Sequence, residues 1–283
     1  MLIHLSNKIG NTKINVQDQF QSIISDPSGH PIFESTGDNA QLVFNESARD
    51  NSYPTYQSTS VPSLAAMEKS FVTMLKDRLD PRLFEIAEPI MDKPANVFSS
   101  YDGVDAGGTV ASQQNESRLA SKIARRYIDD PINEPMIFIG YAEQEFLIAE
   151  AITRGWIIGD AETHYNNGIA ASMQFYGIGD SEIATYISGP LVAFNSANAL
   201  RLIIEQKYIS FFLNSYWEPF FEQRRTGIPE LSVGPGTLNN GLVPKRWMYP
   251  QSEFNYNQSN VASAVDQQFG GTDDTNGEMW LLK

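Results

Sequence analysis

The sequence contains no cysteine, and this absence removes several kinds of chemistry at once. Disulfide bonds, thiolate metal sites and cysteine nucleophiles are all excluded. Proteins of reducing and oxidising compartments can both lack cysteine, so the absence does not identify a compartment. The location of the protein has to be inferred from other features of the chain.

Basic residues and long apolar runs are also scarce. Lys and Arg number 20 against 34 Asp and Glu, which gives a formal net charge of −14 at pH 7. Nucleic-acid binding depends on Lys and Arg that displace counterions, so we expect no nucleic-acid partner. No stretch reaches the ~18 apolar residues of a membrane-spanning helix. Residues 1–16 lack the basic and apolar regions of a signal peptide.

The remaining composition is that of a packed globular protein. The chain has 283 residues, of which 41% are hydrophobic and 11% aromatic, enough for one large domain or two smaller ones. Its first residues, "MLIHLSN", resemble the last turns of an amphipathic helix, with Leu2 and Leu5 on one face. We therefore expect an N-terminal part of the protein to be missing from this sequence.

Two loop regions and a first helix are predicted before residue 120. Residues 10–60 are rich in turn residues around one candidate strand at 40–44, and residues 96–117 read as a loop too polar to bury. Between them, Ser60 and Pro62 are typical of a helix start, and apolar residues recur at helical spacing. A helix over about 62–79 is predicted.

A helical hairpin is predicted over about 141–176, after a short strand at 136–139. Its spacing of small and large residues fits a tetratricopeptide repeat at Ile148, Ala149, Ile152, Ala161, Tyr165 and Gly168. Glu145 departs from the repeat, which prefers a large apolar residue there. Only one such unit is found, whereas a solenoid needs about three.

A long core helix is predicted over 197–212, with Pro219 expected to kink or interrupt it. The segment "FFEQRRTGIP" follows, with Arg224 and Arg225 in a last helical turn ahead of a glycine. Cations there complement the negative end of the helix dipole. We therefore interpret the arginine pair as completing a helix, with one arginine buried among carboxylates.

Several segments in this order resemble the SusD/RagB-like family of nutrient-binding outer-membrane lipoproteins. The resemblance spans nearly the whole chain. It is carried by "DPRLFEIAEP", "EPMIFIGYAEQEFLIAEAITRGW", "AETHYNNGIAASMQFYGI", "IIEQKYISFFLNSYWEPFFEQRRTGIPEL", "RWMYPQSEFNYN" and "GGTDDTNGEMW". Each motif alone is weak, but the ordered set is specific. Trp247 and Tyr249 belong to this shared frame and are interpreted as structural.

The resemblance implies a mainly α fold, in which tetratricopeptide-like hairpins carry long irregular loops and a few short strands. Residues 1–283 would be the C-terminal part of one such domain, without the lipid anchor of the complete protein. The implied function is non-catalytic capture of oligosaccharides or similar nutrients at the cell surface for a TonB-dependent SusC-like transporter. The alternatives are a helical-repeat scaffold for a protein or peptide partner and, more distantly, a secreted glycosidase.

Two loops offer the residues that sugar binding requires, namely aromatic faces beside polar groups. They supply the candidate ligand-binding residues Asn51, Tyr53, Tyr56, Tyr101 and Asp102. The alternative interpretation is that these tyrosines fix the loops onto the helices.

Catalytic and metal sites are not expected. The three histidines are scattered, neither a GxSxG nor an HExxH motif occurs, and the paired acidic residues lie in turn-like sequence. No cofactor or metal is therefore predicted.

Overall fold

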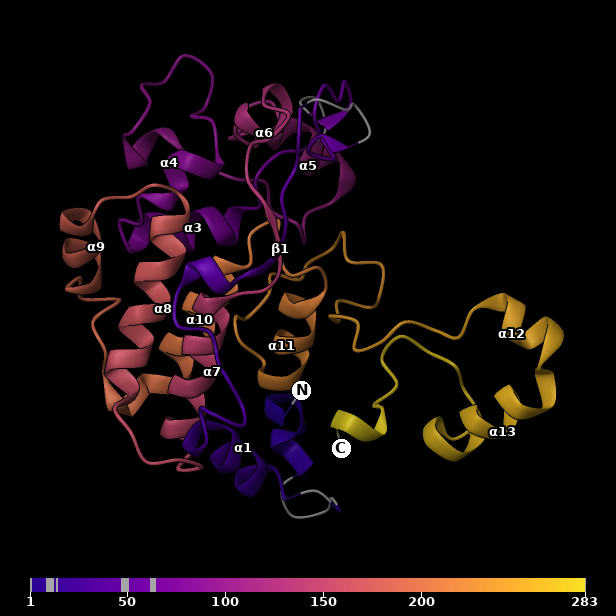
Figure 1. The fold of residues 1–283 in the computed structure, drawn as a ribbon. Helices are drawn as coiled ribbons and strands as arrows, with labels where there is room; N and C mark the ends of the chain where they lie inside the picture. Colours follow the sequence, from indigo (N-terminus) through magenta and orange to yellow (C-terminus); the bar gives the residue numbers. More distant parts are fainter. Residues whose placement is uncertain (1, 9–12, 14, 47–50, 62–64, 283) are drawn as a thin grey trace.

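The described residues are mainly helical, as predicted (Figure 1). The computed structural model describes residues 2–8, 13, 15–46, 51–61 and 65–282. Its α-helices are α1 (Val16–Ser25), α3 (Lys69–Asp77), α4 (Arg82–Ile86), α5 (Val110–Glu116), α6 (Arg126–Asp129), α7 (Tyr141–Thr153), α8 (Ala161–Phe175), α9 (Asp180–Ile187), α10 (Ala199–Ser210), α11 (Glu218–Thr226), α12 (Gln251–Tyr256) and α13 (Gln258–Phe269). Short 3-10 helices are η1 (Leu2–Lys8), η2 (Thr36–Asp38), η4 (Phe98–Ser100), η5 (Ser196–Asn198) and η6 (Trp280–Leu282). None of the described helices is long and apolar enough to span a bilayer.

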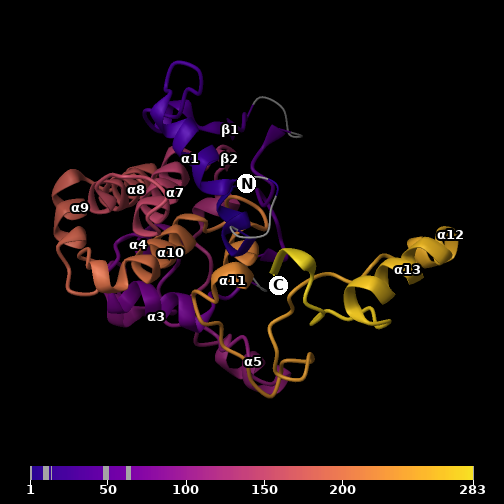
Figure 2. The same cartoon turned by 90° about the horizontal axis from the view of Figure 1, so that it is seen from below.

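Helices α7 and α8 form the predicted hairpin at the centre of the body. Helix α10 packs against both of them, and α9 flanks α8 on its outer side, as Figure 2 shows from below. Glu145, the departure from the repeat pattern, is buried and accepts hydrogen bonds from Asn167 Nδ2 at 3.1 Å and the His164 imidazole at 2.9 Å. The buried carboxylate is therefore paired across the hairpin.

Gly168 sets how closely the two helices of the hairpin approach. A Cβ at this position would lie 2.7 Å from the Phe146 ring, which is itself fully buried. We expect Gly168→Ala to lower the free energy of unfolding by about 1–3 kcal/mol, because the ring has to move within a packed core. Urea denaturation measures the change, with Gly179→Ala as the control, since a Cβ there meets open space. Equal effects of the two substitutions would contradict the close packing.

A two-stranded antiparallel sheet joins segments about a hundred residues apart. Strand β1 (Ala40–Leu42) pairs with β2 (Met136–Ile139), and the register places Ala40 opposite Ile139 and Leu42 opposite Met136. Both predicted strands are therefore confirmed. The sheet holds the N-terminal loop against the start of α7.

In the described part of the chain, the core consists of two groups of buried side chains. The larger group lies between α3, α4, α7, α8 and α10. The smaller group lies where α1 and η1 cover α7, and there Phe20 meets Trp156 edge-on, with ring centroids 5.9 Å apart. Leu2 and Leu5 both pack against this smaller group, as their shared helical face predicted, although the helix is of the 3-10 type.

Among the described residues, the predicted helix over about 62–79 is present as α3, which spans Lys69–Asp77. Helix α3 begins at Lys69, where the Glu68 carboxylate accepts a hydrogen bond from Phe71 N at 2.8 Å. The preceding residues are extended, because Ala66 and Glu68 pair with other segments of backbone. Pro62 lies outside the described residues.

The predicted interruption of the core helix is present. Helix α10 ends at Ser210, and Leu213, Ser215 and Tyr216 take positive φ angles before α11 begins. Pro219 stands in the first turn of α11, where a missing backbone donor costs nothing. The proline therefore starts the second helix instead of kinking one continuous helix.

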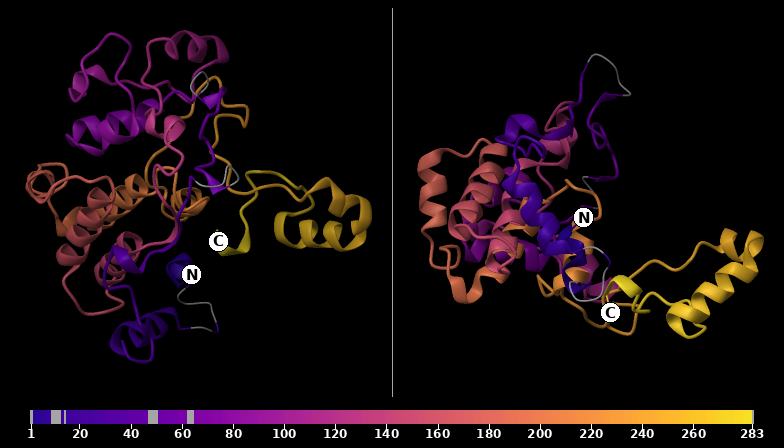
Figure 3. Two further views of the ribbon diagram at one scale, coloured as in Figure 1. Left: turned by 45° about the horizontal axis from the view of Figure 1, so that its top comes forward. Right: turned by 60° about the horizontal axis from the view of Figure 1, so that its bottom comes forward.

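Helices α12 and α13 form an arm that extends away from the body (Figures 1 and 3). At its base, Arg246 pairs with Asp273 and lies 4.2 Å from the centre of the Phe269 ring. Asp273 also accepts a hydrogen bond from Tyr249 N at 2.9 Å. The Arg246 guanidinium also lies 5.4 Å from the Tyr249 ring, so this side chain packs at the base of the arm.

Candidate functional site

The arginine pair ends α11 as predicted. Gly227 follows in the left-handed conformation, with φ of 74°, and its N–H donates to the carbonyl of Gln223. Arg224 lies over the Phe221 ring at 4.7 Å and donates to the carbonyl of Lys245. Arg225 points into the body and has only 3% of its side chain exposed. The two arginines therefore support the fold at different depths.

Arg225 is the centre of a buried charge network. Its guanidinium donates to both oxygens of Glu150, at 2.7 and 2.9 Å, and to Glu222 at 2.6 Å. Burial alone would lower the pKa of Arg225, but Glu150 and Glu222 outweigh it and raise the pKa. Burial would likewise raise the pKa of Glu222, but Lys207 and Arg225 lower it to about 2. Arg225 and Glu222 are therefore charged at neutral pH.

A cluster of His4, Glu218 and Glu222 has the residue types of a metal site among the described residues. However, the imidazole of His4 meets a carboxylate on each side, with Glu218 at 3.0 Å and Glu222 at 3.6 Å. The ammonium of Lys207 also lies 3.4 Å from Glu222. The Lys207 ammonium already pairs with the Glu222 carboxylate. The cluster is therefore an ion-pair network that ties η1 to α11.

The loop that carries Asn51, Tyr53 and Tyr56 packs onto α6. Tyr53 is 6% exposed and its ring meets Tyr127 at 5.8 Å. Its backbone N–H donates to Pro131 O at 2.7 Å. The ring face of Tyr53 is thus covered and cannot stack on a sugar, which corrects its predicted role. Asn51 is exposed and Tyr56 is partly buried, so these two remain candidates.

The second predicted loop is also partly buried, contrary to the expectation from its polar composition. It forms η4 and α5, and Tyr101 is only 1% exposed because its ring packs against Phe84 at 5.4 Å. Tyr101 therefore fixes the loop onto the helices. Asp102 is partly exposed and accepts from Gly103 N at 2.8 Å. No described hydrogen bond or ring contact joins this loop to the one around Tyr53.

An exposed aromatic surface lies around the start of α11. Trp217 is 58% exposed and Trp247 is 51% exposed, and their rings meet edge-on at 4.9 Å. Phe220 contacts Trp247 at 5.0 Å, while Tyr216 and Phe138 stack nearly parallel at 6.0 Å. The structural role predicted for Trp247 fits its ring contacts with Trp217 and Phe220, but half of its surface is exposed. Grouped exposed aromatics mark contact surfaces.

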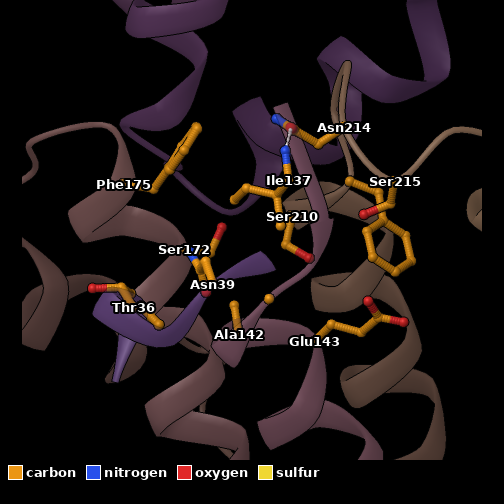
Figure 4. A pocket seen from close by; sticks show the side chains of 13 residues that line it. Thr36, Asn39, Ile137, Ala142, Glu143, Ser172, Phe175, Ser210, Asn214 and Ser215 are labelled. Carbon is orange, nitrogen blue, oxygen red and sulfur yellow. Dashed lines mark hydrogen bonds between the residues drawn. The ribbon is translucent and has the colours of Figure 1, made fainter. Parts of the chain in front are cut away.

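A small hollow lies between α7, α8, α10 and the start of β2 (Figure 4). Thr36, Ala142 and Ser210 line it, and Asn214 accepts a hydrogen bond from Ile137 N at 2.8 Å at its edge. The hollow encloses about 40 Å³, which is room for little more than a water-sized group. It is too small for a sugar.

A larger polar pocket adjoins this hollow and shares Thr36, Asn39 and Phe175 with it. We call it the Arg126 pocket; it measures about 350 Å³ and its walls include Gln41, Arg126, Asn133, Gln174, Phe175 and Tyr176. They come from β1, α6, the segment before β2, and the end of α8. None of them was a predicted site residue.

The architecture is that of a helical-hairpin protein with long irregular loops, and comparison with known proteins identifies its family. A family described as SusD-like, starch-binding and associating with the outer membrane, matches residues 1–250. The chain belongs to this family, as the ordered motifs predicted. No curated protein matches the sequence.

Solved structures of the family share the fold over the whole chain. An outer-membrane protein of Bacteroides vulgatus, described as involved in nutrient binding, is 35% identical with a TM-score of 0.92. A SusD homologue of Bacteroides fragilis is 30% identical with a TM-score of 0.91, and a chitin-binding protein is 25% identical with a TM-score of 0.80. Each match covers 100% of this chain and, in that order, 65%, 65% and 62% of the other.

Proposed function

We propose that the protein is a non-catalytic binding protein that captures oligosaccharides, or similar nutrients, at the outer membrane. The observation that carries this proposal is the family match over residues 1–250, whose description names starch binding and association with the outer membrane. The chain spans about 65% of the length of the first relatives. The complete protein would be lipid-anchored and would deliver its ligand to a TonB-dependent SusC-like transporter.

The geometry offers a place for such a ligand beside α6. The loop around Tyr56 rests on this helix, because Gln57 N donates to Ile128 O at 2.8 Å and Thr55 donates to Tyr127 O. Arg126, at the start of the same helix, lines the polar pocket. The loop around Tyr56 and the Arg126 pocket therefore both contact α6. A rigid helix that positions loop residues is a common arrangement for binding sites.

The proposal predicts glycan binding that depends on the loop beside α6. Isothermal titration calorimetry against starch-derived and chitin-derived oligosaccharides tests it. We expect Tyr56→Ala to weaken binding about two- to tenfold through loss of an aromatic contact. Tyr256→Ala is the matched control, because Tyr256 is 92% exposed on the arm formed by α12 and α13.

Equal effects of the two substitutions would show that the loop around Tyr56 is not part of the binding site, and would leave the proposal of glycan capture standing. Failure of the unmodified chain to bind any glycan would contradict the proposed function. It would favour the alternative of a scaffold for a protein or peptide partner, for which the aromatic surface around Trp217 offers a contact area.

A further inference from the structure

The Arg126 pocket has a rigid wall. Arg126 donates to Glu134 at 2.5 Å, and its guanidinium carbon lies 5.2 Å from the Tyr127 ring and 5.5 Å from the Tyr176 ring. Glu134 also accepts from the Tyr127 hydroxyl at 3.2 Å and from Asn214 Nδ2 at 3.4 Å. These contacts fix the guanidinium plane before any ligand arrives. A preorganised polar wall loses little conformational entropy on binding.

Three polar groups in the walls lack partners. Seven buried side-chain nitrogen or oxygen atoms of the described residues have no hydrogen-bond partner. Three of the seven belong to this pocket: Arg126 Nε, Asn133 Nδ2 and the Tyr176 hydroxyl. The hydroxyl of Tyr127 is near Tyr176, but no hydrogen bond of ordinary geometry joins the two. Buried donors without acceptors are unfavourable. A ligand oxygen that reached these groups would supply the acceptor that they lack.

The charges around the pocket select against an anionic ligand. The positive charge of Arg126 is already paired with Glu134, and Glu85 lies 3.7 Å from the same guanidinium. Burial raises the pKa of Glu134, and Arg126 only partly offsets this effect. One arginine between two carboxyl groups leaves no surplus positive charge for a carboxylate or phosphate. The other polar side chains of the wall are neutral, namely the amides of Asn39, Gln41, Asn133 and Gln174 and the hydroxyls of Thr36 and Tyr176.

From these observations we infer that the Arg126 pocket is a subsite for one neutral, hydroxyl-rich sugar unit of a bound glycan. This inference rests on the proposed function and names the part of the ligand that the pocket takes. The volume of about 350 Å³ lies at the lower end of the range for small-molecule sites. Amide groups and unpartnered donors match sugar hydroxyls, and the Phe175 ring supplies an apolar wall.

The test compares glycan affinities of three single variants by calorimetry. Asn133→Ala and Gln174→Ala each remove an amide from the pocket, and we expect each to weaken binding of a neutral oligosaccharide about two- to tenfold. Gln21→Ala is the control, because Gln21 is exposed on α1, and Figure 1 shows α1 at the opposite end of the body from α6. An oligosaccharide of the same length that carries uronic acids should bind more weakly than the neutral one.

The outcomes separate the subsite from the proposed function. Unchanged affinity of the Asn133→Ala and Gln174→Ala variants, with glycan binding by the unmodified chain, would overturn the subsite and leave the function standing. Tighter binding of the acidic oligosaccharide would overturn the neutral assignment. No glycan binding at all would overturn both. Melting temperatures of the variants establish that any loss of affinity does not come from unfolding.

Discussion

Replacing Arg225 with alanine is expected to lower the free energy of unfolding by about 3–5 kcal/mol. The substitution leaves the carboxylates of Glu150 and Glu222 buried, with exposures of 0% and 5%, and without their shared guanidinium. Arg154 still lies 2.7 Å from Glu150 and Lys207 3.4 Å from Glu222, but both carboxylates lose the charge-assisted hydrogen bonds from the buried guanidinium. Breaking a buried hydrogen-bonded charge network is among the largest effects that a single substitution can have. Against a typical total stability of about 5–15 kcal/mol, this loss is severe.

The neighbouring arginine provides the matched control for this prediction. Arg224 lies over the Phe220 and Phe221 rings and donates to the carbonyl of Lys245 and the sulfur of Met279. Among the described residues it forms no ion pair, so its replacement leaves no carboxylate without a partner. Arg224→Ala should therefore cost less than about half as much as Arg225→Ala in a urea titration followed by circular dichroism. Equal losses of unfolding free energy in the two variants would show that the contacts of Arg225 with Glu150 and Glu222 stabilise the protein no more than an arginine at a helix end does. Ligand affinity of the folded protein should change little in either variant.

The second large effect is a loss of stability in acid that depends on Glu222. The pKa of Glu222 is about 2 in the folded protein, against an ordinary value of 4.5. A lowered folded-state pKa contributes stability that is present above the unfolded value and is lost as pH falls through the folded value. The contribution is therefore complete above about pH 5 and disappears towards pH 2. Its size is on the order of 3 kcal/mol.

Glu222→Gln should remove this contribution. The variant should be less stable than the unmodified protein at pH 7, and the difference between the two should shrink as pH falls from 5 to 2. Urea titrations across this range measure the difference, so titration of other groups cancels in the comparison. Glu182→Gln on α9 is the control, since Glu182 is exposed and holds no cation. A stability difference between Glu222→Gln and the unmodified protein that does not change with pH would contradict the lowered pKa of Glu222.

The helices and strands that depend on local sequence could be predicted. Apolar spacing located the hairpin α7–α8, and the sequence "RRTG" located the end of α11, because these signals act within a few residues. The start of α3 was misplaced for the opposite reason. Its preceding residues pair with Val104 and Lys122, and such distant pairing leaves no trace in local spacing.

The candidate site was harder to predict than the fold. A tyrosine in a polar loop looks available, yet Tyr53 and Tyr101 are buried by helices that approach from elsewhere in the chain. Conversely, Arg126, Asn133 and Tyr176 come from three separate segments. Nothing in "ARRYIDD" or "MQFYG" distinguishes them from surface residues. The contact of the Tyr56 loop with α6 joins residues about seventy positions apart, and local spacing cannot reveal it.

The contacts of η1 with α11 have a consequence for the order of folding. His4 meets Glu218 across 214 residues of sequence, and Ser6 meets Arg225 across 219. The hairpin α7–α8 closes over a short turn and can gain its contacts early, whereas closing a loop of this length costs entropy before any contact repays it. We therefore expect the first turns of the chain to dock last and to detach first, so that they govern the unfolding rate more than the folding rate.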